Sequence, residues 1–153
     1  MIPADATTLV AMSLLGRTDI VRRLVGKVTV GDATAREIEA AVETLDPGCQ
    51  PPGEEVLEVV YMDVTAPTLS LSESETLQLA RENEARLALS DDPVIRQELR
   101  AHGTRSIGTP GLLYGAYVRG LIQDLEEPIR RLQQAGYRLS EECREGLREA
   151  AQK

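Results

Sequence analysis

The chain has 153 residues, a length typical of one domain that can bury a core. Its formal net charge is −8, from 17 basic and 25 acidic side chains. Nucleic acid therefore repels it at long range unless metal ions, a local arginine patch or a basic partner intervene. Only four Tyr represent the aromatic residues, with no Phe or Trp. This scarcity excludes a platform that stacks bases and predicts a core of Leu, Val, Ile and Ala.

The sequence shows no signal for secretion, membrane insertion or zinc binding. No basic segment followed by an apolar run opens the chain, and no apolar run approaches the ~18–20 residues that span a bilayer. We therefore expect a cytoplasmic protein without membrane contact. Cys49 and Cys143 stand alone, with no CxxC motif and no nearby histidine, so we expect reduced structural thiols.

Strands and helices alternate along the first two thirds of the chain. The patterns predict strands near 1–4, 27–30, 56–64, 86–89 and 104–107. Pro3 restricts the first of these strands to an edge or first-residue position, and Pro67 ends the third. Helices are predicted over 9–15 and 19–25, and then after Asp32, Ser72 and Asp92. We expect Asp32 and Asp92 to be N-caps, Ser72 and Glu75 to form a capping box, and His102 to end a helix.

After residue 111 the sequence predicts only helices: to about Arg119, over 123–135, and after Ser140. Alternation of this kind is typical of a parallel sheet with right-handed crossovers. We predict an α/β fold, a three-layer sandwich with a central parallel sheet of four to five strands and helices on both faces. It would be a single domain over 1–153, with an α/β core over 1–111 and a helical C-terminal extension over 112–153.

Four acidic residues, Asp5, Glu37, Glu73 and Asp92, lie near points where predicted strands end and helices begin. In an open α/β sheet those points share one edge, where such sheets place their sites. Carboxylates gathered there repel one another unless a cation lies between them. Taken singly, Asp5, Glu73 and Asp92 also fit helix caps, and Glu37 fits a solvated helix residue. Together they favour a site for Mg²⁺ or Mn²⁺, which prefer oxygen ligands.

The order and spacing of several short segments across the chain resemble those of a PIN domain. The likeness extends to a branch of that family with a Gly-Thr-x-Gly turn and a helical C-terminal tail, and it rests on residues 5–10, 15–17, 37–38, 71–80, 89–92, 107–113, 119–122 and 132–140. Gly31, Ser72 and Pro110 depart from the residues common in the family, but no acid is lost.

The resemblance implies a ribonuclease that hydrolyses RNA phosphodiester bonds with Mg²⁺ or Mn²⁺, often the toxin of a VapC-type toxin–antitoxin pair. Carried over by position, the catalytic and metal-binding residues would be Asp5, Glu37, Glu73 and Asp92, with Asp91 as the alternative to Asp92. Ser90 occupies the place of a Thr or Ser that the family often has before its last acid. RNA, an antitoxin protein and a second copy in a homodimer are the partners expected.

Other interpretations stay open. The chain also fits a non-catalytic PIN-like interaction module whose acids are caps and surface charge. A phospho-acceptor receiver domain is excluded, because it needs a lysine after its last strand and none lies between Lys27 and Lys153. Arg96 fits an intrahelical pair with Asp92 or a phosphate contact.

Two further features of the last third have two interpretations each. Thr109 fits a helix cap, and its hydroxyl could also face the acids. The apolar face that carries Tyr114 and Tyr117 fits either core or a dimer or antitoxin surface.

Overall fold

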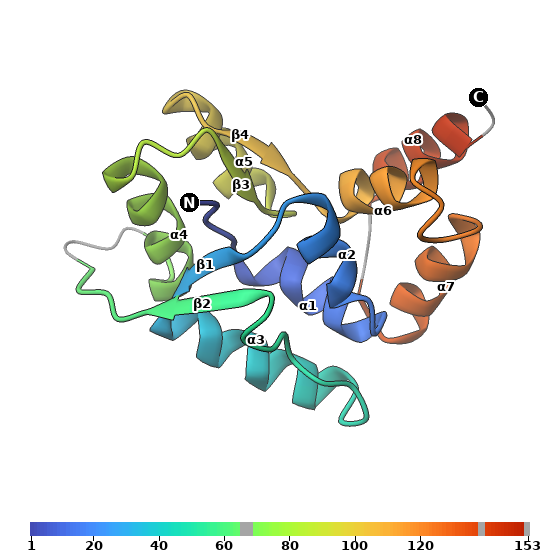
Figure 1. The fold of residues 1–153 in the computed structure, drawn as a ribbon, viewed down its shortest axis with the longest axis horizontal. Helices are drawn as coiled ribbons and strands as arrows, with labels where there is room; N and C mark the ends of the chain where they lie inside the picture. Colours follow the sequence, from blue (N-terminus) through green and yellow to red (C-terminus); the bar gives the residue numbers. More distant parts are fainter. Residues whose placement is uncertain (65–68, 138–139, 152–153) are drawn as a thin grey trace.

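The computed structural model describes residues 1–64, 69–137 and 140–151, in which strands alternate with helices up to β4 and only helices follow (Figure 1). The α/β class predicted from the sequence is confirmed. Pro67, Arg138 and Leu139 lie outside the described residues. The strands are β1 (Val28–Gly31), β2 (Leu57–Val60), β3 (Leu87–Leu89) and β4 (Arg105–Ile107). The helices are α1 (Ala6–Leu14), α2 (Thr18–Leu24), α3 (Asp32–Leu45), α4 (Leu71–Glu82), α5 (Pro93–Ala101), α6 (Thr109–Val118), α7 (Glu126–Gln134) and α8 (Glu141–Ala151).

The strands form two parallel pairs with the start of the chain between them. β1 pairs with β2, and β3 pairs with β4. Pro3 makes a single bridge to Thr29, and Ala4 makes one to Leu89. A continuous sheet of four or five strands is therefore not confirmed. Proline has no N–H to donate, and α1 begins at Ala6, so the first segment joins the two pairs without extending into a strand of its own.

Helix α1 is the centre of the molecule. Eight of its residues are buried, and it contacts α2, α3, α6 and α7. A helix that is apolar on nearly all sides has to be surrounded by other elements. Ser13 is buried with its hydroxyl donating to the Leu9 carbonyl oxygen at 2.7 Å, which satisfies that polar group. The core contains Leu, Val, Ile and Ala as predicted, with Met12 added.

Two helices begin at other residues than predicted. Gly31, rather than Asp32, is the N-cap of α3, and Ser70, rather than Ser72, is the N-cap of α4. The predicted Ser72–Glu75 capping box is absent from the described residues. The Glu75 carboxylate instead reaches from α4 to the start of α3, where it accepts hydrogen bonds from Thr34 N and Thr34 Oγ1, each at 2.7 Å. A side chain from another element therefore supplies the cap of α3.

Other predicted helix ends are confirmed. Asp92 is the N-cap of α5 with Pro93 after it, and His102 is the C-cap of that helix. The predicted apolar face of α6 is divided: Leu113 is buried and Tyr117 packs against the core, whereas Tyr114 is 39% exposed. Among the described residues, no helix has the length and apolar character needed to cross a membrane.

Candidate functional site

Asp5 lies at the point where the bridging segment ends and α1 begins. Its N–H donates to the Leu89 carbonyl oxygen at 2.8 Å, which fixes it beside the end of β3. Its carboxylate accepts hydrogen bonds from Thr7 N at 2.6 Å, from the Thr7 hydroxyl and from the Ser90 hydroxyl. The residue is only 3% exposed. Burial, with a smaller contribution from the charge of Asp91, raises the pKa of Asp5 to about 6, although the hydrogen bonds from Ser90 and Thr7 oppose this rise.

Asp91 lies beside Asp5 and has its own set of donors. Its carboxylate accepts hydrogen bonds from Thr109 N at 2.6 Å, from the Thr109 hydroxyl and from the Tyr137 hydroxyl at 2.8 Å. The Asp91 N–H donates to Thr7 Oγ1 at 2.9 Å, and the same Thr7 hydroxyl donates to Asp5. Thr7 thus links the two acids. The expectation that the Thr109 hydroxyl could face the acids is confirmed.

Asp92 turns the other way. Its carboxylate accepts hydrogen bonds from Val94 N at 2.8 Å and Ile95 N at 3.2 Å, as the N-cap of α5 requires. Its own N–H donates to Ser90 Oγ at 3.1 Å. The sequence left Asp91 and Asp92 as alternatives for one ligand. In the structure Asp92 caps α5, and Asp91 lies close enough to Asp5 for its charge to contribute to the raised pKa of Asp5.

The side chains of Glu37 and Glu73 both bond to serines at the start of α4. Glu37 is an exposed residue of α3 whose carboxylate accepts a hydrogen bond from the Ser72 hydroxyl. Glu73 accepts one from the Ser70 hydroxyl at 2.8 Å. One turn further along α4, Thr76 Oγ1 donates to the Ala4 carbonyl oxygen at 3.4 Å, which places this helix beside the segment that carries Asp5.

The predicted acids therefore form two groups. Asp5 and Asp91 lie together beside Ser90 and Thr7, whereas Glu37 and Glu73 are held by serines at the beginning of α4. Asp92 reaches Ser90 only through its N–H, because its carboxylate caps α5. Within the described ranges, no three His, Cys, Asp or Glu side chains come together in an arrangement ready to hold a metal ion.

The donor chemistry at Asp5 and Asp91 nevertheless fits Mg²⁺ or Mn²⁺. A carboxylate oxygen offers about two lone-pair sites. In the described structure, Asp5 Oδ2 accepts one hydrogen bond, from Ser90, and Asp91 Oδ1 accepts one, from Thr109 N. Each carboxylate thus keeps lone-pair capacity for a cation. Mg²⁺ is usually held by one or two carboxylates, with waters and substrate phosphates completing its shell, so a pair of acids suffices.

A glycine turn lies tightly against these acids. A Cβ added to Gly108 would come within 2.3 Å of Asp91 Oδ1 and 2.8 Å of Arg96 Nη1. The missing side chain lets the backbone before α6 approach the carboxylate, so that Thr109 N can donate to it. Arg96 Nη1 donates to the Ser90 carbonyl oxygen at 3.2 Å. The expected ion pair between Arg96 and Asp92 is not found among the described residues, since this contact and the cap of α5 occupy the two side chains.

Sequence reasoning missed Thr7 and Tyr137. Thr7 follows Asp5, the N-cap of α1, by two residues. A hydroxyl at that distance from a helix cap is a local sequence pattern that could have identified it as a partner of the carboxylate. Tyr137 lies 46 residues after Asp91, in a segment that the sequence marked as the end of a helix and as part of the family resemblance, with no role for the tyrosine. No local pattern indicated that it returns to the acids.

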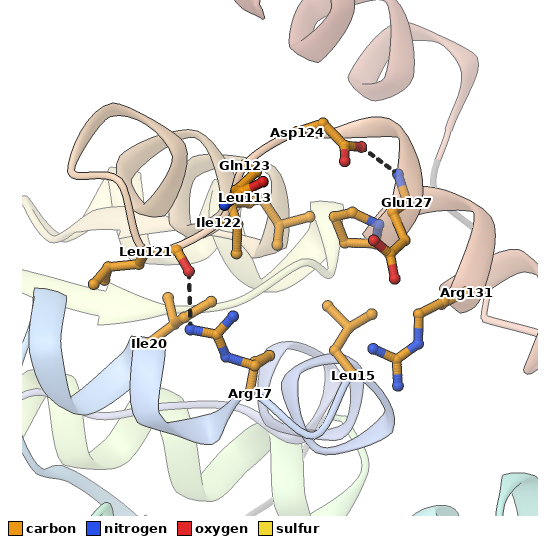
Figure 2. Close-up of a pocket in the computed structure, with 11 residues that line it drawn as sticks. Leu15, Arg17, Ile20, Leu113, Leu121, Ile122, Gln123, Asp124, Glu127 and Arg131 are labelled. Carbon is orange, nitrogen blue, oxygen red and sulfur yellow. Dashed lines mark hydrogen bonds between the residues drawn. The ribbon is translucent and has the colours of Figure 1, made fainter.

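A separate hollow of about 300 Å³ lies between the end of α1 and the connection from α6 to α7, as Figure 2 shows. Arg17 borders it and donates to Asp19 Oδ1 at 2.9 Å and to the Leu121 carbonyl oxygen at 3.2 Å. These bonds fix the connection between α6 and α7 onto the turn that precedes α2. None of the predicted acids lines this hollow, so it is distinct from the candidate site.

Parallel strands are joined by helices, and the buried Asp5 and half-buried Asp91 accept hydrogen bonds from hydroxyl groups beside the end of β3. This is an α/β domain with polar side chains at the sheet edge where such folds place their sites. A family model for the PIN domain matches residues 1–153, so the chain belongs to the PIN-domain family. Domains of this family are generally nucleases that use divalent metals and bind nucleic acid. No curated protein and no solved structure gives a significant match to the chain.

Proposed function

We propose that this PIN domain is a metal-dependent endoribonuclease that hydrolyses RNA phosphodiester bonds. The observation that carries the proposal is the pair of neighbouring carboxylates, Asp5 and Asp91, joined through Thr7 beside the end of β3. Family membership supports nuclease chemistry in general. RNA as the substrate and metal dependence in this chain belong to the proposal.

Asp5 and Asp91 would hold Mg²⁺ or Mn²⁺, with Glu37 and Glu73 as further ligands that the family resemblance implies by position, while the Asp92 carboxylate caps α5. The bound ion would supply Lewis-acid stabilisation of the charge that develops on phosphate oxygens. The surrounding hydroxyls orient the acids. Ser90 and Thr7 fix the Asp5 carboxylate, and Thr109 and Tyr137 fix that of Asp91. A positioned carboxylate can accept the proton of the attacking water.

The raised pKa of Asp5 agrees with a cation site. Burial makes the ionised form costly when no positive charge lies nearby. A cation between Asp5 and Asp91 would remove this cost and the repulsion between the two acids. The site is therefore expected to bind a divalent ion with release of protons at pH values near 6.

The decisive experiment compares RNA cleavage in Mn²⁺ and Mg²⁺ by the wild type, Asp5→Asn and Glu37→Gln. Both substitutions keep the side-chain size and remove the charge, so loss of cleavage with retained fold supports the roles proposed. The matched controls are Asp63→Asn and Glu43→Gln, which change exposed acids away from the cluster. Undiminished cleavage by both site variants would reject the assignment of these two acids.

A non-catalytic interaction module is the second candidate. Asp5 and Asp92 both cap helices, and the described residues contain no preformed cage of three acidic or histidine ligands. Titration with Mn²⁺ separates the two candidates. A module of this kind shows no saturable Mn²⁺ binding that Asp5→Asn abolishes, whereas the nuclease does. A toxin role, an antitoxin partner and a homodimer stay predictions of the family resemblance.

A further inference from the structure

Helix α5 and the start of β4 border a second hollow, of about 370 Å³, that is rich in arginine. It is lined by Arg96, Arg100, Gly103, Thr104, Arg105 and Ser106. Three of the six lining residues carry a guanidinium group, and none carries a carboxylate. Gly103 leaves one side open, because a Cβ built there would have no atom within 4 Å.

The three arginines have no acidic partner among the described residues. The ion pairs of that part of the chain include Arg81 with Glu98 of α5, but none includes Arg96, Arg100 or Arg105. Three positive charges around one hollow repel one another, and an anion bound among them relieves that repulsion. This local positive charge occurs in a chain whose net charge is −8.

Arg96 belongs to both the arginine pocket and the acid site. Its Nη1 donates to the carbonyl oxygen of Ser90, the residue whose hydroxyl bonds Asp5. The space that a Gly108 side chain would need is occupied by Asp91 Oδ1 and Arg96 Nη1 together. A ligand that extends from the acids along α5 therefore passes Arg96 and then reaches Arg100, one helical turn further on.

We propose that this arginine pocket binds a backbone phosphate of the RNA strand, next to the phosphate held at the acid site. The inference rests on the proposed nuclease function. Guanidinium groups match phosphate oxygens with paired N–H donors. An acidic nuclease needs such a local contact, because the rest of its surface repels the strand. The pocket thereby determines on which side of the acids the strand continues.

The test measures binding of a short fluorescent single-stranded RNA without divalent metal, over a series of salt concentrations. Arg100→Ala/Arg105→Ala changes two exposed side chains, and Arg100→Lys/Arg105→Lys keeps their charge. Because each phosphate contact contributes about 0.7 to the slope of log affinity against log salt, the alanine variant, which loses the one contact proposed, is expected to lose up to about 0.7 from it. The lysine variant is expected to retain most of the slope. Arg130→Ala, on the exposed side of α7, is the matched control and keeps the full slope.

The outcomes separate this inference from the nuclease proposal. An unchanged slope in the alanine variant, or an equal loss of slope in Arg130→Ala, rejects phosphate binding by the arginine pocket even if Mn²⁺-dependent cleavage is present. A selective loss of slope supports the pocket even if the wild type fails to cleave, and then only the nuclease proposal is rejected. A nucleoside 5′-monophosphate is titrated in parallel. If it binds through Arg100 and Arg105 while the RNA slope stays unchanged, the pocket takes a free phosphate group and the strand assignment is overturned.

Discussion

The hydroxyl oxygen of Tyr137 lies 2.8 Å from the carboxylate of Asp91 and 2.9 Å from the carbonyl oxygen of Thr7, so the two acceptors share its single proton. One side chain from the helical C-terminal part thus contacts the segments that carry Asp5 and Asp91. The division into a core over 1–111 and a helical extension over 112–153, expected from the sequence, therefore does not separate the site from the tail. The chain after α7 helps to hold the acids in place.

Replacing Tyr137 with Phe is expected to weaken the fold. The change removes the one donor that the partly buried oxygens of Asp91 and Thr7 share, which costs roughly 1–3 kcal/mol. Burial, followed by the charge of Asp91, raises the pKa of Tyr137, so the folded protein favours the neutral phenol. Wild-type stability is therefore lost as pH rises above the unfolded value of about 10, and Tyr137→Phe lacks this loss.

Urea unfolding at pH 7 and pH 10.5 measures both effects of the Tyr137 change. Tyr61→Phe is the control, because Tyr61 is 87% exposed. Equal unfolding free energies for wild type and Tyr137→Phe at pH 7 would show that the bond to Asp91 contributes nothing.

The stability of the folded protein is expected to depend on the ionisation of Asp5, in the opposite sense to that of most carboxylates. Its pKa rises from 3.8 to about 6 on folding, so the protonated form is favoured in the folded state. The contribution to stability is complete below pH 3.8 and is lost as pH rises through 6, and such a rise corresponds to roughly 3 kcal/mol. Asp5→Asn removes this dependence, so its stability relative to wild type increases between pH 4.5 and pH 7. Denaturant unfolding without metal at both pH values measures the difference.

Asp19 supplies a control of opposite sign for that experiment. Its hydrogen bond from Arg17 lowers the pKa of Asp19, so its contribution to stability is lost as pH falls. The Asp19→Asn difference from wild type therefore shrinks toward low pH. If Asp5→Asn behaves in the same way as Asp19→Asn, Asp5 is ionised at no cost in the folded protein.

Gly31 is expected to tolerate no side chain. A Cβ at this position would lie 2.2 Å from Glu75 Cδ, so Glu75 would have to leave the N–H groups of Ala33 and Thr34. Uncapping α3 and leaving buried polar groups without partners should cost roughly 1–3 kcal/mol in Gly31→Ala. Thermal unfolding measures the change. Gly146→Ala is the matched control: it lies in α8 with nothing within 4 Å of an added Cβ, and the same substitution there stabilises a helix.

The sequence predicted the features of this fold that depend on local pattern. Hydrophobic periodicity located the four strands of the described residues within a few residues, although the strand predicted near 1–4 forms only two isolated bridges. The Asp92-Pro93 pair marked a helix start that the structure confirms. It could not predict Glu75, because a buried carboxylate that caps a different helix has the same local signal as one that caps its own. The role of Tyr137 could not be predicted for the same reason, because its partners lie far away in the chain and only tertiary packing brings them together.

Asp91 and Asp92 are adjacent in sequence, but their environments predict different consequences of the same substitution. Asparagine is as good an N-cap as aspartate, so Asp92→Asn should keep both the stability of α5 and Mn²⁺ binding. Asp91→Asn removes a charge beside Asp5 and should abolish Mn²⁺ binding and RNA cleavage while the fold stays intact. Asp92→Ala should lower stability by about 1 kcal/mol and still bind Mn²⁺. Calorimetric Mn²⁺ titration of the three variants measures this, and loss of the metal only in the Asp92 variants would transfer the ligand role from Asp91 to Asp92.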